Sequence, residues 1–138
     1  DKTRLVDATR PGGFDFLGYH FERGQKWPRR KALDRFKDKV RERTPRSSGE
    51  SMEATIASLN DMLRGWFGYF KHSSRDRLDG LDSYIRGRLR SILRKRMGRR
   101  GRGRGYDHQR WRNHYFDELG LFSLTRAHVS ARLSPQGV

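Results

Sequence analysis

The 138-residue chain contains no cysteine, and this absence excludes two classes of small domain. Without cysteine there is no disulfide framework, and the thiolate zinc sites of fingers and ribbons are excluded as well. Apolar residues are also scarce, at 33% of the sequence. The length therefore predicts one domain with a modest core and a large solvated surface.

Long apolar runs are absent too. No stretch approaches the length that a membrane-spanning helix needs, and the first residues contain no apolar signal region. We therefore expect a soluble, intracellular protein that has no membrane partner. The sequence starts with Asp rather than Met, inside an apparently ordered motif, so we interpret it as a piece of a longer protein.

Positive charge dominates the sequence, which has a formal net charge of +16. Residues 26–46 hold ten bases and three acids (+7), and residues 81–105 hold ten bases and one acid (+9), so the rest of the chain sums to zero. Two basic blocks favour a polyanionic partner over a merely soluble surface. Arginine predominates over lysine, and its planar guanidinium grips phosphate and stacks on bases, which suits folded RNA.

Apolar residues at three- and four-residue steps predict helices over residues 28–44, 51–70 and 81–97. Pro28 would occupy the first position of the first helix, and Ser51 would cap the second. The polar residues 72–80 are predicted to form a loop. The apolar faces consist of Leu33, Phe36 and Val40; Ile56, Leu59, Leu63, Trp66, Phe67 and Phe70; and Leu81, Ile85, Leu89, Ile92 and Leu93.

The two ends of the chain carry weaker patterns. Residues 2–6 and 14–21 predict a β-hairpin around a turn at 11–13, and residues 24–28 predict a second turn. Four glycines and four arginines make residues 98–105 a basic linker.

Helical spacing resumes at Trp111, Tyr115, Phe116 and Leu119, and Ser123 is expected to cap a last helix that ends near residue 133. This tail is apolar enough to dock on the bundle. The expected fold is mainly α: a three-helix bundle with an N-terminal β-hairpin and a small C-terminal helical tail.

These motifs together resemble the group II intron reverse transcriptases. Residues 2–6 (KTRLV) and 14–21 (FDFLGYHF) are similar to the last block of the palm in that family. Residues 59–70, which include LRGWFGYF, and residues 81–90 (LDSYIRGRLR) resemble its maturase-specific region, also called domain X or the thumb. The tail, with GLFSL at 120–124, is similar to the short carboxyl end of bacterial members.

The resemblance implies a thumb-like bundle that binds group II intron RNA, assists its splicing, and guides the RNA/DNA primer–template duplex. It divides the chain into the end of the palm (1–25), domain X (26–97), the linker (98–105) and a C-terminal extension (106–138). A further implied partner is the rest of the parent reverse transcriptase, and the implied location is the bacterial cytoplasm, in association with a nucleoprotein.

The same resemblance identifies what is missing. The aspartate-rich polymerase motif, usually Tyr-Ala-Asp-Asp, does not occur, so this chain alone is not expected to polymerise DNA. The parent would be an RNA-directed DNA polymerase that uses Mg2+, whereas we expect no cofactor in this chain. The His- and Cys-containing endonuclease domain of many relatives is also expected to be absent.

The candidate RNA-binding residues are the cations of the basic blocks and those beside the aromatic cluster. We expect reversing the charges of Arg88, Arg94 and Lys95 to weaken RNA binding without unfolding the chain. A solvated basic face is the alternative, and in the first block Asp34, Asp38 and Glu42 would pair with neighbouring cations at helical spacing. The candidates are Arg29, Arg30, Lys31, Arg35, Arg64, Lys71, Arg86, Arg88, Arg90, Arg94, Lys95, Arg96, Arg99, Arg100, Arg102 and Arg104.

The aromatic residues have two possible roles, stacking on bases and packing in the core. The apolar stripe favours the core for Trp66, Tyr69 and Phe70, whereas Trp27 and Tyr106 lie beside turns and basic residues and are better stacking candidates.

Two alternative functions remain open. A non-specific basic nucleic-acid-binding module, accessory to a polymerase, would have the same charge pattern. A metal-dependent nuclease would use the five histidines, but His108 and His114 are six residues apart, a poor spacing for one helical face.

Overall fold

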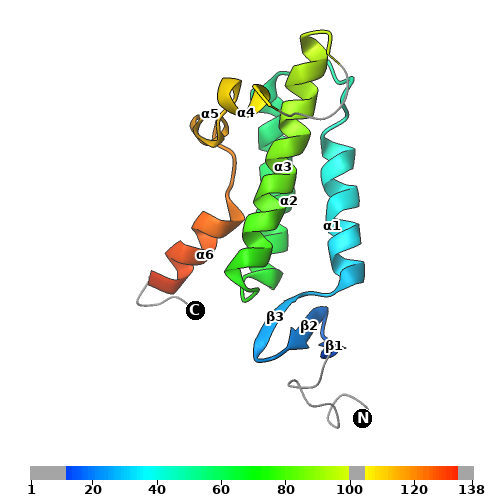
Figure 1. The fold of residues 1–138 in the computed structure, drawn as a ribbon, viewed down its shortest axis with the longest axis vertical. Coiled ribbons are helices and arrows are strands. Elements are labelled where there is room, and N and C mark those ends of the chain that lie inside the picture. The colour runs from blue at the N-terminus through cyan, green and yellow to red at the C-terminus, as the bar shows by residue number, and fades with distance from the viewer. Residues whose placement is uncertain (1–11, 100–104, 134–138) are drawn as a thin grey trace.

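The computed structural model describes residues 12–99 and 105–133. These residues form a mainly helical structure with a three-stranded sheet at its N-terminal end (Figure 1). The mainly α fold class predicted from the sequence is confirmed. The elements are β1 (Phe14–Phe16), β2 (Tyr19–Glu22), β3 (Gln25–Pro28), α1 (Arg30–Arg43), α2 (Met52–Phe70), α3 (Arg75–Arg96), α4 (Asp107–Arg110), α5 (Asn113–Glu118) and α6 (Leu124–Leu133).

The sheet is an antiparallel meander, β1-β2-β3, rather than the predicted hairpin. Residues 14–21 were expected to be one strand, but they fold back on themselves because Leu17 and Gly18 both have positive φ and form a two-residue turn. Arg23 and Gly24 make the second such turn. Paired positive φ angles match the right-handed twist of the strands. Residues 2–6, the other expected strand, lie outside the described residues.

Helix α1 begins two residues later than predicted. Pro28 ends β3, where it pairs with Tyr19, and Arg29 precedes the first helical residue. The end of α1 agrees with the prediction, since Thr44 follows the last turn and its hydroxyl donates to the Val40 carbonyl at 2.6 Å. The predicted cap of α2 is also confirmed: the Ser51 hydroxyl accepts a hydrogen bond from the Ala54 amide at 3.1 Å.

Helix α3 starts at Arg75, whereas residues 72–80 had been predicted to be a loop. That prediction was wrong because Leu78 is fully buried and extends the apolar stripe by one turn before Leu81. The neighbouring charged residues are exposed and therefore hid this single apolar contact in the sequence.

The three long helices lie side by side and enclose the core (Figure 1). Helix α6 packs against α3, and α4 and α5 lie beside the C-terminal half of α3. The predicted tail helix is interrupted at Trp111 and Arg112, so α4 and α5 are separate. The tail docks as expected. The buried apolar residues of the core are Phe36, Val40, Met52, Ile56, Leu59, Leu63, Leu78, Leu81, Ile85, Leu89, Ile92, Trp111, Phe116, Leu121 and Leu124.

Candidate nucleic-acid interface

Helix α1 presents a row of cations to solvent. Its apolar stripe is narrow, with Phe36 and Val40 buried, so the remaining faces carry charge. The predicted internal pairing occurs twice on exposed surface, at Arg30 with Asp34 (3.6 Å) and at Arg41 with Asp38. Exposed pairs of this kind hold their partners weakly.

In the described part of the chain, four exposed cations of α1 lack such a pair, and one of them, Arg43, instead donates to the Ser58 carbonyl at 2.6 Å. Within residues 12–99 and 105–133, no carboxylate lies within ion-pair distance of Lys31, Arg35 or Lys39. These three side chains can therefore bind an external anion without first breaking an internal ion pair.

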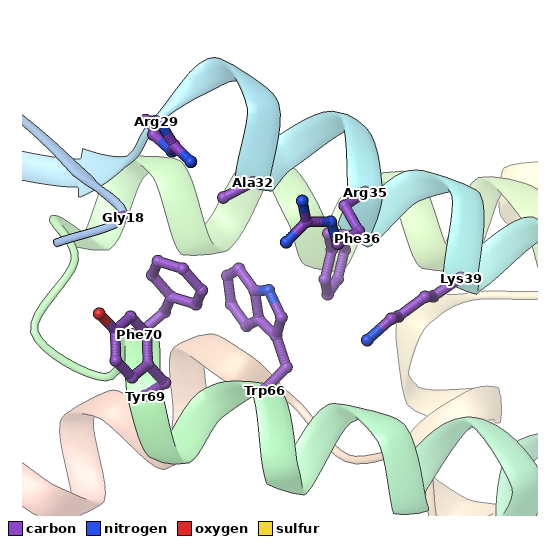
Figure 2. Close-up of a pocket in the computed structure, with 9 residues that line it drawn as sticks. All are labelled: Gly18, Arg29, Ala32, Arg35, Phe36, Lys39, Trp66, Tyr69 and Phe70. Carbon is purple, nitrogen blue, oxygen red and sulfur yellow. The ribbon is translucent and has the colours of Figure 1, made fainter. Parts of the chain in front are cut away.

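A pocket of about 330 Å³ lies between α1 and α2 (Figure 2). It joins cations from the α1 side to aromatic rings on α2, and no acidic residue lines it. Two of its cations, Arg29 and Arg35, were predicted from the sequence, whereas Lys39 was not. The signal that would have identified Lys39 is its position four residues after Arg35 on the same helical face. The lining residues are Gly18, Arg29, Ala32, Arg35, Phe36, Lys39, Trp66, Tyr69 and Phe70.

The core interpretation of the α2 aromatics holds for only part of the cluster. Phe70 is buried and Trp66 is half-buried between Phe36 and Phe70, with ring centroids 4.5 and 4.6 Å away. Tyr69, in contrast, is 54% exposed, so its assignment to the core was wrong.

The two residues preferred for stacking also differ. The Arg77 guanidinium covers the Trp27 ring at 4.1 Å, whereas Tyr106 is 72% exposed. Of the two, Tyr106 alone has a largely open ring.

The cations of α3 are mostly held within the fold. Arg88 donates to the Thr44 carbonyl at 2.7 Å and to its hydroxyl at 3.1 Å. Arg90 is only 4% exposed and donates to the Trp111 carbonyl and the Asn113 side chain, both at 2.8 Å. Burial lowers the pKa of both Arg88 and Arg90. These arginines join α3 to the end of α1 and to the tail.

An ion pair extends this pattern to the end of α3. Arg94 contacts the fully buried Asp107 at 2.7 Å. Reversing the charges of Arg88, Arg94 and Lys95 was expected to leave the chain folded. The structure instead indicates that reversal at Arg94 would destabilise the fold, because a carboxylate at position 94 would face the buried Asp107 carboxylate. Lys95 is exposed and donates to the Ser47 hydroxyl at 2.7 Å, so its charge can be reversed without burying a charge.

The remaining candidates do not form one cluster. Arg86 is half-buried, and Arg96 donates to the Glu50 carbonyl.

The Arg64 guanidinium lies 5.8 Å from the Phe122 ring on the tail side. Lys71 is half-buried, whereas Arg99 is exposed. The linker candidates Arg100, Arg102 and Arg104 lie outside the described residues.

The histidines do not assemble into a metal site: in the described parts of the chain, no three His, Asp or Glu residues lie close enough together to hold a metal ion. His20 instead bonds Glu22 at 2.9 Å and Asp15 at 2.7 Å on the sheet. The hydrogen bond to Glu22, followed by that to Asp15, raises the pKa of His20.

Comparison with known proteins adds one match. Residues 33–115, more than half of the chain, match the family described as group II intron, maturase-specific domain. No curated protein matches the chain. No helix within residues 12–99 and 105–133 is long and apolar enough to cross a membrane.

Proposed function

Because the chain belongs to the group II intron maturase-specific domain family, we propose that it binds folded intron RNA through the exposed cations of α1. Membership of this family implies a role in intron RNA binding and splicing. The finer proposal is that the chain is the thumb segment of an intron-encoded reverse transcriptase. In that setting it also guides the primer–template duplex, and the Mg2+ belongs to the catalytic part of the parent protein.

The observation that carries this proposal is the set of unpaired cations on α1. Lys31, Arg35 and Lys39 are exposed and have no carboxylate partner among the described residues. Each phosphate that they contact releases condensed counterions, which favours binding and makes it depend on salt. Contacts of this kind position the RNA, and contacts to unpaired bases supply selectivity.

A pair of charge-matched variants tests the proposed surface. The first carries Lys31→Gln, Arg35→Gln and Lys39→Gln on α1. The second carries Arg75→Gln, Arg112→Gln and Arg132→Gln, which removes three exposed positive charges elsewhere. Affinity for a folded group II intron RNA is measured for both variants across a salt series.

The α1 variant is expected to bind more weakly, and the slope of log K against log salt should become shallower by about 2–3, close to one for each lost phosphate contact. The second variant should keep most of the wild-type slope. Equal losses in the two variants would show that the α1 cations contribute no more than other exposed cations, and would favour the non-specific basic module.

A further inference from the structure

The pocket between α1 and α2 combines two chemistries on facing walls. Figure 2 shows Arg29, Arg35 and Lys39 on the α1 side and the rings of Trp66 and Tyr69 on the α2 side. Its volume of about 330 Å³ is within the range of pockets that hold small molecules, roughly 300–1,000 Å³. The space is therefore large enough for one flat ring with an attached charged group.

The charge of the pocket selects an anion. Three cations line it and no acidic residue does. Arg29 is half-buried, and its backbone amide donates to the Gly18 carbonyl at 2.8 Å, so the chain that carries it is fixed to the sheet. Arg35 and Lys39 are four residues apart on α1 and extend the cationic wall along the helix.

The aromatic wall is held in place before any ligand binds. The Tyr69 hydroxyl donates to the Leu17 carbonyl, and the Tyr19 hydroxyl donates to the Tyr69 carbonyl at 2.7 Å. Gly18 lies against the Tyr69 ring: a Cβ added there would come within 3.3 Å of the ring. The β1–β2 turn thus fixes Tyr69, which remains 54% exposed although its ring also contacts Tyr19 and Phe70.

We propose that this pocket receives one unstacked nucleotide of the bound RNA. The base lies against Tyr69 and Trp66, and the phosphates on either side of it contact Arg35, Lys39 and Arg29. This inference rests on the proposed RNA-binding function and specifies how one unpaired position is recognised. Exposed aromatic rings beside a cationic track are the usual platform for unpaired bases.

An acidic protein segment is the competing occupant, since it would also satisfy the cations. The aromatic wall favours a nucleotide, because the open part of the Tyr69 ring, which already contacts Tyr19 and Phe70, can stack on a base, whereas a carboxylate side chain cannot stack on it. The family match, which implies an RNA partner, points the same way.

The experiment compares RNA probes that differ only in the base. One set of short RNA hairpins carries a single bulged nucleotide, with each of the four bases in turn. The matched probe carries an abasic residue at the bulge, which keeps the number of phosphates constant. Affinities are measured for the wild-type chain, Tyr69→Ala and Tyr115→Ala, the last as an exposed aromatic control on α5, away from the pocket.

The wild type should bind at least one bulged probe on the order of ten-fold more tightly than the abasic probe, since stacking on an aromatic side chain contributes about that much. Tyr69→Ala should lose this difference, and Tyr115→Ala should keep it. Equal affinity for bulged and abasic probes in the wild type, or an unchanged preference in Tyr69→Ala, overturns the proposal. In either case an acidic protein segment becomes the better candidate for the occupant of the pocket.

A second comparison does not depend on the stability of the aromatic variant. Arg35→Gln and Lys31→Gln each remove one exposed charge from α1, but only Arg35 lines the pocket. Arg35→Gln should weaken binding to the preferred bulged probe several-fold more than Lys31→Gln, and equal losses count against the pocket. The first comparison sets a bulged base against an abasic residue, and the second sets one position of α1 against another. Neither depends on a preference for intron RNA, so failure of this proposal can be distinguished from failure of the proposed function.

Discussion

The Asp82 carboxylate on α3 accepts a hydrogen bond from the Leu124 backbone amide at 2.9 Å, across 42 residues of sequence. The same carboxylate accepts from the Thr125 amide and the Ser123 hydroxyl, both at 3.0 Å. It therefore acts as an N-terminal cap for α6 from another helix. Because Asp82 is buried, this contact attaches the tail to the bundle.

Replacing Asp82 with Ala should release α6. Three hydrogen bonds to a charged group are lost and two backbone amides lose their partner, so the free energy of unfolding should fall by about 2–3 kcal/mol. Urea denaturation measures the loss, and limited proteolysis should cut near residue 121. Asp79→Ala, an exposed acid one turn earlier on α3, is the control and should change little. Equal stability of the two variants would show that the tail is held by apolar contacts alone.

Replacing Arg94 with Met should destabilise the fold rather than remove an RNA contact. Asp107 is fully buried beside it and would keep the more distant Arg110 guanidinium, 3.9 Å away, so loss of the close pair should cost about 3 kcal/mol, the lower end of the range for breaking a buried pair. Thermal unfolding checks this change. Lys95→Met is the matched control: it should leave stability within about 0.5 kcal/mol of wild type and weaken RNA binding. If Arg94→Met kept full stability, Arg94 would again be a candidate for direct phosphate contact.

The stability of the sheet should depend on pH through His20. Hydrogen bonds to Glu22 and then Asp15 raise the pKa of His20 in the folded chain. A raised folded-state pKa adds stability that is fully present below the unfolded-state value of about 6.5, and that is lost as pH rises through the folded pKa. The difference in unfolding free energy between wild type and His20→Gln should therefore be larger at low pH than above the folded pKa.

Urea denaturation of both proteins at about pH 5.5 and pH 8.5 measures this difference. His114→Gln is the control, because His114 contacts Glu118 on exposed surface. A His20 effect that grew with rising pH would contradict the assignment of these hydrogen bonds to the protonated ring.

The helical part of the fold was readable from the sequence because its signals are local and repeated. The stripe of Ile56, Leu59 and Leu63 places α2, and Ser51 supplies its start. The sheet was predicted incorrectly because its turns use Leu17 with Gly18 and Arg23 with Gly24. The Asn-Gly and Asp-Gly pairs that usually indicate a tight hairpin are not used at these turns.

The candidate site was only partly readable for a different reason. Charge counts find basic blocks, but they do not separate an exposed cation such as Lys31 from a buried one such as Arg90. That distinction depends on partners far away in the sequence, such as Trp111 for Arg90. The pocket joins the β1–β2 turn, α1 and α2, so no single stretch of sequence contains it.

The proposed RNA-binding function can be tested by measuring the affinity of this chain for a folded group II intron RNA, in competition with unrelated structured RNA and duplex DNA, across a salt series. The preference for intron RNA should persist at high salt, because contacts to unpaired bases are less sensitive to screening than phosphate contacts. Equal affinity for all three competitors, falling together as salt rises, would contradict it and leave a basic module without selectivity.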